Sequence, residues 1–171
     1  MDFVELVAAR YSCRSYRPDT VEASRLARVL EAARLAPTAC NRQPFKLFVL
    51  ETSQYAAELG RIYRRPWFAQ APWVIGVAAD VGRAWVRRDG MNYGVVDATI
   101  AFDHLILAAA AEGLGTCWVA AFDAAAAREV LGLDGDWEPV AFTPLGWPAD
   151  TAPVKERVAL ESLVQFGLRR E

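Results

Sequence analysis

One long apolar stretch, Val95–Gly115, restricts the fold of this chain more than any other feature. Its length would suit a membrane span, but four polar residues interrupt it: Asp97, Asp103, His104 and Glu112. We therefore predict a helix buried in a protein core. Hydrophobic residues make up 54% of the chain, and the 11 glycines raise the apolar share to roughly 60%, above the usual ~45–50%. The chain must bury either a large core or a large interface.

The 171 residues correspond to one domain. Apolar spacing and turn residues predict helices and strands that alternate, with irregular stretches after the first two helices. The expected helices are 3–9, 21–35, 55–63, 95–112 and 124–131, and the expected strands are 45–50, 73–79, 116–120, 140–143 and 162–168. Residues 80–93 form a loop. This order indicates an α+β fold in which helices pack on a small sheet.

Composition and motif content exclude several functional classes. The net charge of −2 does not suit nucleic-acid binding, and a start without a basic or strongly apolar leader favours a cytoplasmic protein. Three cysteines without a CxxC pair and a single histidine argue against zinc and dithiol sites. The chain has no GxSxG or GxxxxGK[ST] motif, and residues 113–118 match the dinucleotide fingerprint poorly. If the protein is an enzyme, a bound cofactor supplies its chemistry.

Two short basic segments place cations in an alternating pattern. Arg10, Ser12 and Arg14 would point the same way from an extended loop, and Lys155 and Arg157 repeat the alternation near the other end. Converging guanidinium and hydroxyl groups would suit a phosphate. Taken alone, each segment is more simply interpreted as a solvated surface loop.

The order of six motifs is more specific than any one of them. R-x-S-x-R at 10–14 is followed by APTACNRQPF at 36–45, Ala71-Pro72, GLGTCWVAAF at 113–122, PLGWP at 144–148 and K-x-R at 155–157. Over nearly its whole length the chain thus resembles the FMN-dependent nitroreductase family, particularly its short members. This resemblance implies a nitroreductase-like α+β fold, with helices packed around a small mixed, mostly antiparallel sheet.

The resemblance also implies a cofactor site that two subunits share. In that family the first basic loop and the K-x-R element hold the FMN phosphate. The strand end after GLG presents its backbone to the flavin ring. The 36–45 segment reaches the flavin of the partner subunit. The implied FMN-binding residues are Arg10, Tyr11, Ser12, Arg14, Trp118, Val119, Ala120, Ala121, Lys155 and Arg157, with Thr38, Ala39, Cys40, Asn41 and Gln43 from the partner. No metal ligand and no catalytic side chain is expected.

The implied assembly is a domain-swapped homodimer. Residues 1–171 would form one FMN-binding domain, with 160–171 as an arm that crosses to the partner. The implied activity is ping-pong hydride transfer, in which NADH or NADPH reduces FMN and an electron-poor small molecule, such as a nitroaromatic compound or a quinone, reoxidises it. Neither a nucleic acid nor a membrane is an expected partner. Two alternatives remain: a specialised reaction (reductive dehalogenation, flavin fragmentation or peptide dehydrogenation), and flavin binding without useful turnover.

A few residues depart from the family pattern or have two interpretations. Many relatives carry Ser where this chain has Ala39 or Cys40. Cys40 is expected to be a small packing residue rather than a redox thiol, since no base or resolving cysteine adjoins it. His104 and Asp97, seven residues apart, are expected to form a buried hydrogen-bonded pair. The 80–93 loop could be a substrate lid or a mobile surface loop.

Overall fold

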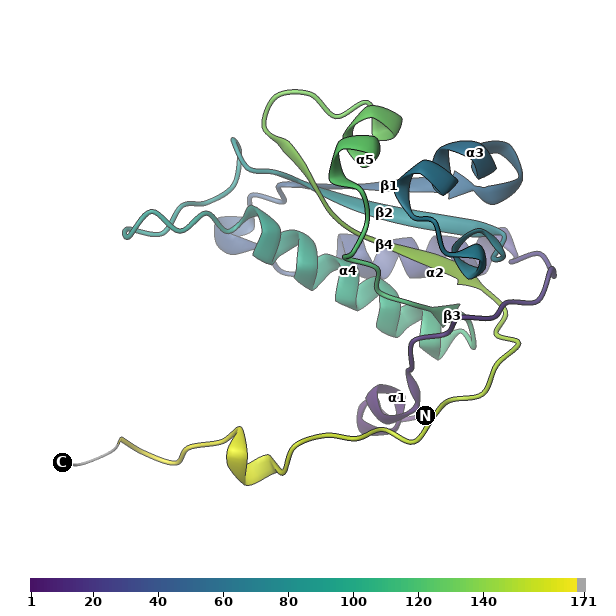
Figure 1. The fold of residues 1–171 in the computed structure, drawn as a ribbon. Helices are drawn as coiled ribbons and strands as arrows, with labels where there is room; N and C mark the ends of the chain where they lie inside the picture. Colours follow the sequence, from purple (N-terminus) through teal and green to yellow (C-terminus); the bar gives the residue numbers. More distant parts are fainter. Residues whose placement is uncertain (169–171) are drawn as a thin grey trace.

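The computed structural model describes residues 1–168, and three layers make up its body (Figure 1). An antiparallel four-stranded sheet in the order β1-β2-β4-β3 lies between two pairs of helices. The strands are β1 (Phe45–Glu51), β2 (Trp73–Asp80), β3 (Gly115–Thr116) and β4 (Trp137–Gly146). Helices α2 (Ala23–Arg34) and α4 (Gly94–Ala111) cover one face, and α3 (Thr52–Ile62) and α5 (Ala124–Leu131) cover the other. The α+β class is confirmed.

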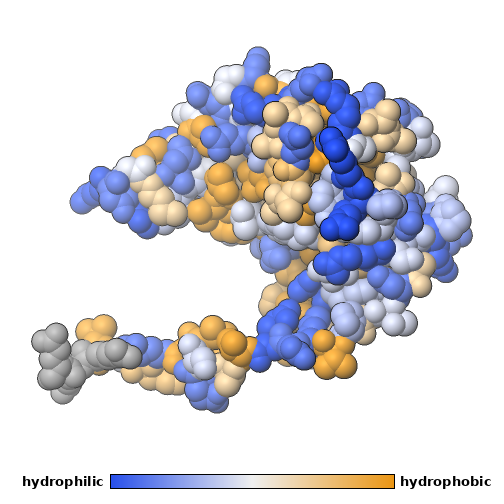
Figure 2. All heavy atoms as spheres, in the orientation of Figure 1, coloured by the Kyte–Doolittle hydropathy of each residue, from blue (hydrophilic) through white to orange (hydrophobic). Residues whose placement is uncertain are grey.

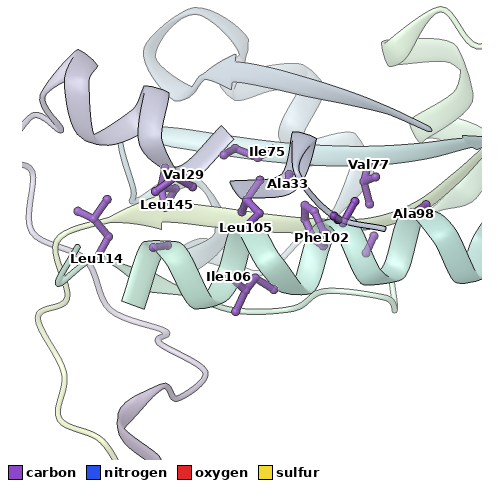
Figure 3. Packing of buried hydrophobic residues seen from close by; sticks show 14 of the residues in the cluster. Val29, Ala33, Ile75, Val77, Ala98, Phe102, Leu105, Ile106, Leu114 and Leu145 are labelled. Carbon is purple, nitrogen blue, oxygen red and sulfur yellow. The ribbon is translucent and has the colours of Figure 1, made fainter. Parts of the chain in front are cut away.

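The predicted long apolar helix is α4, and it packs where a core helix should. Its inward side meets α2 and the sheet through Ala98, Phe102 and Leu105, each 0% exposed (Figure 3). Among the helices of residues 1–168, α4 alone is long and apolar enough to cross a membrane. Its contacts with the sheet are those of a buried core helix.

Strand β2 contributes side chains to the hydrophobic clusters on both faces of the sheet. Ile75, Val77 and Ala79 point toward α2 and α4, whereas Val74 points to the cluster beneath α3 and α5. Alternation along a strand sends neighbouring side chains to opposite faces, so a strand that is apolar up to its last residue fits between two helical layers.

Three predicted strands differ from the structure by more than one residue, and one of them, β4, is longer than the predicted 140–143. The strand predicted at 116–120 is shorter: β3 covers only Gly115–Thr116, and Val119 adds an isolated bridge to Phe142. The strand predicted at 162–168 is wrong, because Leu160–Ser162 is a 3₁₀ turn and the rest of that segment, through residue 168, is irregular. Within one chain this segment meets no sheet edge.

The chain ends differ in how they join the body. Helix α1 (Phe3–Ala9) is held by an N-terminal capping box between Asp2 and Glu5, and it contacts α4. After β4 the chain runs beside α1 and then leaves the body as an extended arm, residues 151–168 (Figure 1). Figure 2 shows hydrophobic residues along this arm and on the edge of the body that faces it across open space. The expected arm was 160–171, and residues 169–171 lie outside the described part.

Candidate functional site

The first basic loop is held on both sides by backbone hydrogen bonds. Ser12 forms a parallel bridge with Thr116 of β3, and the Cys13 N–H donates to the Thr116 carbonyl at 2.8 Å. On the other side, the Ala149 N–H donates to the Ser15 carbonyl at 2.8 Å. The loop therefore lies between β3 and the segment that follows β4, and non-local contacts set its conformation.

One carboxylate, that of Asp150, gathers three donors from this loop. Its Oδ2 accepts from the Arg14 N–H at 2.8 Å, and its Oδ1 accepts from the Tyr11 hydroxyl at 2.8 Å and the Cys13 thiol at 3.1 Å. Burial alone would raise the pKa of Asp150, but these hydrogen bonds outweigh it and leave that pKa below its usual value. Asp150 is therefore ionised at neutral pH.

The two basic segments meet in one hollow, as the family resemblance implied. The hollow has a volume of about 240 Å³ and is lined by 10–12, Arg14 and 153–157. Lys155 reaches across it to donate to the Val7 carbonyl at 3.1 Å and to the Ala8 carbonyl, so it also caps the end of α1. Burial, together with the charges of Arg10 and Arg157, lowers the pKa of Lys155. Positive charge is therefore concentrated here.

None of the four cations around this hollow has a carboxylate partner within residues 1–168. The salt bridges of that region involve other arginines, such as Arg28 with Glu112 and Arg34 with Glu31. Arg14 is exposed and lies over the Trp67 ring, with its guanidinium carbon 5.9 Å from the ring centroid. Glu156 also lines the hollow, but its carboxylate pairs with none of the four cations, so the lining keeps an excess of positive charge. Such an excess fits an anionic ligand, and a phosphate dianion suits the mixed guanidinium and ammonium chemistry of these cations.

The predicted ring-facing segment continues directly from β3. Val119 exchanges two backbone hydrogen bonds with Phe142, at 2.8 and 3.0 Å, and Trp118 packs edge-on against Phe102 with centroids 5.0 Å apart. Ala120 and Ala121 are exposed. The backbone is thus held in place at Val119 and is accessible at Ala120 and Ala121, which suits contact with a bound ring.

Ala121 also lines a second hollow, of about 540 Å³, that the sequence did not point to. Its other walls come from the end of α3 and the residues after it, including Arg61, Arg64 and Arg65. Arg61 pairs with Glu129. The signal available in the sequence was three arginines within five residues just before Pro66.

The 38–43 segment forms a tight turn with an unusual backbone. Cys40, Asn41 and Gln43 all have positive φ, at 52°, 53° and 51°. Two hydrogen bonds hold the turn: the Gln43 N–H donates to Thr38 Oγ1 at 3.0 Å, and the Ala39 N–H donates to Asp97 Oδ1 at 2.9 Å. Left-handed residues other than glycine persist where surrounding structure compensates their strain, often at ligand sites.

Two expectations about this region are wrong. Cys40 is exposed within the chain, so it is not a packing residue there. Asp97 is 1% exposed and accepts from the Ala39 N–H rather than from His104, which is half-buried. Asp97 therefore connects the turn to the start of α4.

One chain does not bring all the predicted residues together. The turn is anchored at Asp97 near the start of α4, whereas Arg10 and Tyr11 share a small pocket with Ala110 and Gly113 at its end. At 1.5 Å per residue, the helix separates these two groups by about 20 Å. Within one chain, the basic loop, the ring-facing segment and the K-x-R element are contiguous, and the turn stands apart.

The sequence and the fold of the chain both match those of a known protein family. A family model described as the nitroreductase family matches residues 7–64 and 52–147, which is most of the chain. The chain belongs to the nitroreductase family. A crystal structure of a nitroreductase family protein from Clostridium difficile 630 is 34% identical and superposes with a TM-score of 0.91, over 99% of this chain and 100% of that one.

Curated relatives of this nitroreductase-family chain carry oxidoreductase names. A protein named FMN reductase [NAD(P)H] from Bacillus subtilis is 27% identical over 89% of this chain and 68% of its own length. A protein named NADH dehydrogenase from Thermus thermophilus is 27% identical, over 91% of each chain.

Proposed function

We propose that the protein is an FMN-dependent NAD(P)H oxidoreductase that reduces an electron-poor small molecule of the nitroaromatic or quinone type. Membership of the nitroreductase family and the names of the relatives support the reaction class. The observation that carries the choice of cofactor is the hollow lined by Arg10, Arg14, Lys155 and Arg157.

The charge of this hollow matches the FMN phosphate. That phosphate carries about −2 at neutral pH, and each charge-assisted hydrogen bond contributes about 1.5–3 kcal/mol. Two or three such bonds from four cations would account for a large share of a tight binding constant. Riboflavin, which lacks the phosphate, could not use them.

When bound, FMN supplies the capacity to accept a hydride from NAD(P)H and to pass it to the acceptor. The chain itself binds and orients. Arg10, Ser12, Arg14, Lys155 and Arg157 would hold the phosphate end, and the open backbone at Ala120 and Ala121 would contact the ring. Such a scheme assigns no side chain an acid or base role.

The complete site would require a second copy of the chain. The turn at 38–43 lies about 20 Å along α4 from the basic hollow, so it would contact the flavin of a partner rather than its own. The extended arm would cross to that partner and cover apolar surface. Several arm side chains are exposed and apolar, among them Leu160 at 69%, Leu163 at 70% and Phe166 at 95%.

An absorption spectrum of the purified protein, recorded with and without NAD(P)H under argon, tests the proposal. We expect a flavin spectrum that NADH or NADPH bleaches at a catalytic rate and that an added quinone or nitroaromatic compound restores. A flavin that stays oxidised would indicate sequestration. Bleaching without reoxidation by either acceptor would indicate a specialised reaction. A protein that never binds FMN would contradict the proposal.

A further inference from the structure

Asp150 is a negative charge beside a site proposed for a dianion, and that position needs an explanation. It follows β4 and the PLGWP motif, five residues before Lys155, and it does not line the hollow. Coulomb's law alone predicts that a carboxylate here weakens phosphate binding. Its hydrogen bonds point to the opposite effect.

All three side-chain hydrogen bonds of Asp150 come from the basic loop. Two go to Oδ1, from the Tyr11 hydroxyl and the Cys13 thiol, and one goes to Oδ2, from the Arg14 N–H. The Tyr11 hydroxyl also lies 3.0 Å from the Asp150 carbonyl oxygen. The Tyr11 and Cys13 side chains lie between Arg10, Ser12 and Arg14 along the chain, so the carboxylate binds the loop at the residues that separate its cations.

The same residue belongs to the segment that leads to the second basic element. The pairing of Ser15 with Ala149 continues the contact between the two segments, and Lys155 and Arg157 follow within a few residues. Asp150 therefore joins the two halves of the hollow, which lie more than 130 residues apart in sequence.

We propose that Asp150 is a positioning residue for the FMN phosphate site: it aligns Arg14 with Lys155 and Arg157 and so strengthens binding despite its own negative charge. This inference rests on the proposed function for the identity of the ligand. The carboxylate has three donors, so much of its charge is compensated, whereas a loop that lost them could not keep its cations aligned.

The direction in which Asp150→Asn changes the affinity for FMN distinguishes charge repulsion from positioning. Asp150→Asn removes the charge and keeps the size, but its NH₂ group must face either the Arg14 N–H or the Tyr11 and Cys13 donors. If charge repulsion dominated, FMN would bind more tightly. If positioning dominates, FMN should bind about 10-fold or more weakly, in line with the loss of a hydrogen bond to a charged group.

The measurement is the dissociation constant of apo-protein for FMN and for riboflavin, followed by flavin fluorescence. For Asp150→Asn we expect the preference for FMN over riboflavin to fall about 10-fold, with riboflavin affinity unchanged within about twofold. A general loss of structure would weaken both ligands. Asp150→Glu should restore part of the preference, and Asp103→Asn, at an exposed position on α4, should leave it unchanged.

A double-mutant cycle tests the route through the loop. Tyr11→Phe deletes one donor to Asp150 and should weaken FMN a few-fold, but it should add little to Asp150→Asn because both act through one link. Additive losses would contradict positioning through Tyr11. Unchanged or tighter FMN binding by a folded Asp150→Asn protein would overturn the inference.

A second probe separates this inference from the proposed function. Inorganic phosphate should raise the melting temperature of the wild-type apo-protein and raise it less in Asp150→Asn. If wild type binds phosphate but not FMN, the proposed function fails, and the phosphate comparison still decides the role of Asp150. If wild type binds FMN and both proteins discriminate equally against riboflavin, only the role of Asp150 fails.

Discussion

Arg14 is the most direct test of the anion hollow at the scale of single residues. Its side chain is exposed, lines the hollow and has no carboxylate partner within residues 1–168. Arg14→Ala should weaken FMN about 10- to 150-fold, equivalent to about 1.5–3 kcal/mol, without changing riboflavin affinity. Titration of apo-protein with both flavins measures this, and Arg88→Ala, on the exposed tip of the 80–93 loop, is a matched control. Equal losses for both flavins would contradict a phosphate contact.

The ionisation of Asp150 makes a second prediction, about stability and pH. Its pKa in the folded protein lies below the usual 3.8, so the ionised form stabilises the fold. This contribution is complete above about pH 5 and is lost as the pH falls through the unfolded-state and then the folded-state pKa. The difference in unfolding free energy between wild type and Asp150→Asn should therefore be constant from pH 7 to about pH 5 and shrink below it. Urea unfolding across that range measures it; a gap that widens in acid would refute this assignment.

At the scale of elements, the contact between β3 and the basic loop is tight enough to be tested at one glycine. A Cβ added at Gly115 would lie 2.8 Å from the Cys13 sulfur and 3.0 Å from its Cβ. Both atoms belong to a side chain that is 0% exposed, so the loop itself would have to move. Gly115→Ala should cost about 1–3 kcal/mol of stability and weaken FMN as well.

Thermal unfolding and FMN titration measure the two effects of Gly115→Ala. Gly60→Ala is the control, because it has nothing within 4 Å of the added Cβ and lies in α3. A stable Gly115→Ala protein with normal FMN affinity would show that the loop adapts without cost.

Two of the elements that the sequence predicted well have a strong apolar pattern. Helix α4 and strand β2 lie within about one residue of their predicted bounds, because burial of their side chains decides their conformation. Strand β4 is longer than the predicted 140–143, because Pro139 and Pro144 weaken the strand pattern at its two ends. The sequence showed an alternating pattern at 162–168, but a strand also needs an edge, and none lies within reach in one chain.

The same reasoning explains how much of the candidate site was foreseen. The meeting of Arg14 with Lys155 followed from charge pattern and family resemblance together. The turn at 38–43 could not be foreseen in detail, because Cys40 and Gln43 seldom adopt positive φ and depend on Asp97, more than 50 residues away. Asp150 was missed for a similar reason: its three partners lie more than 130 residues earlier.

At the scale of the whole molecule, the extended arm should decide both assembly and cofactor content. Residues 162–168 include Leu163, Phe166 and Leu168, exposed at 70%, 95% and 93% in the single chain. Burying two such side chains on a partner would contribute about 3–6 kcal/mol per subunit. Truncation after Glu161 should therefore give monomeric or poorly soluble protein without FMN.

Sedimentation and the flavin-to-protein ratio measure the effect of this truncation. Truncation after Leu168, which keeps the apolar arm, is the control. A monomer that retains stoichiometric FMN and full reductase activity would refute the shared site.

Because α4 separates the 38–43 turn from the basic hollow of the same chain, the shared site can be tested by coexpressing two variants. If each flavin takes Arg14 from one chain and Asn41 from the other, two defective proteins should repair each other. An Arg14→Ala chain paired with an Asn41→Ala chain would carry both lesions in one site and leave the other intact, so coexpression should restore about one site in four. Activity that reappears only in the mixture would show complementation between subunits, whereas mixtures no better than either parent would place both residues in the same site.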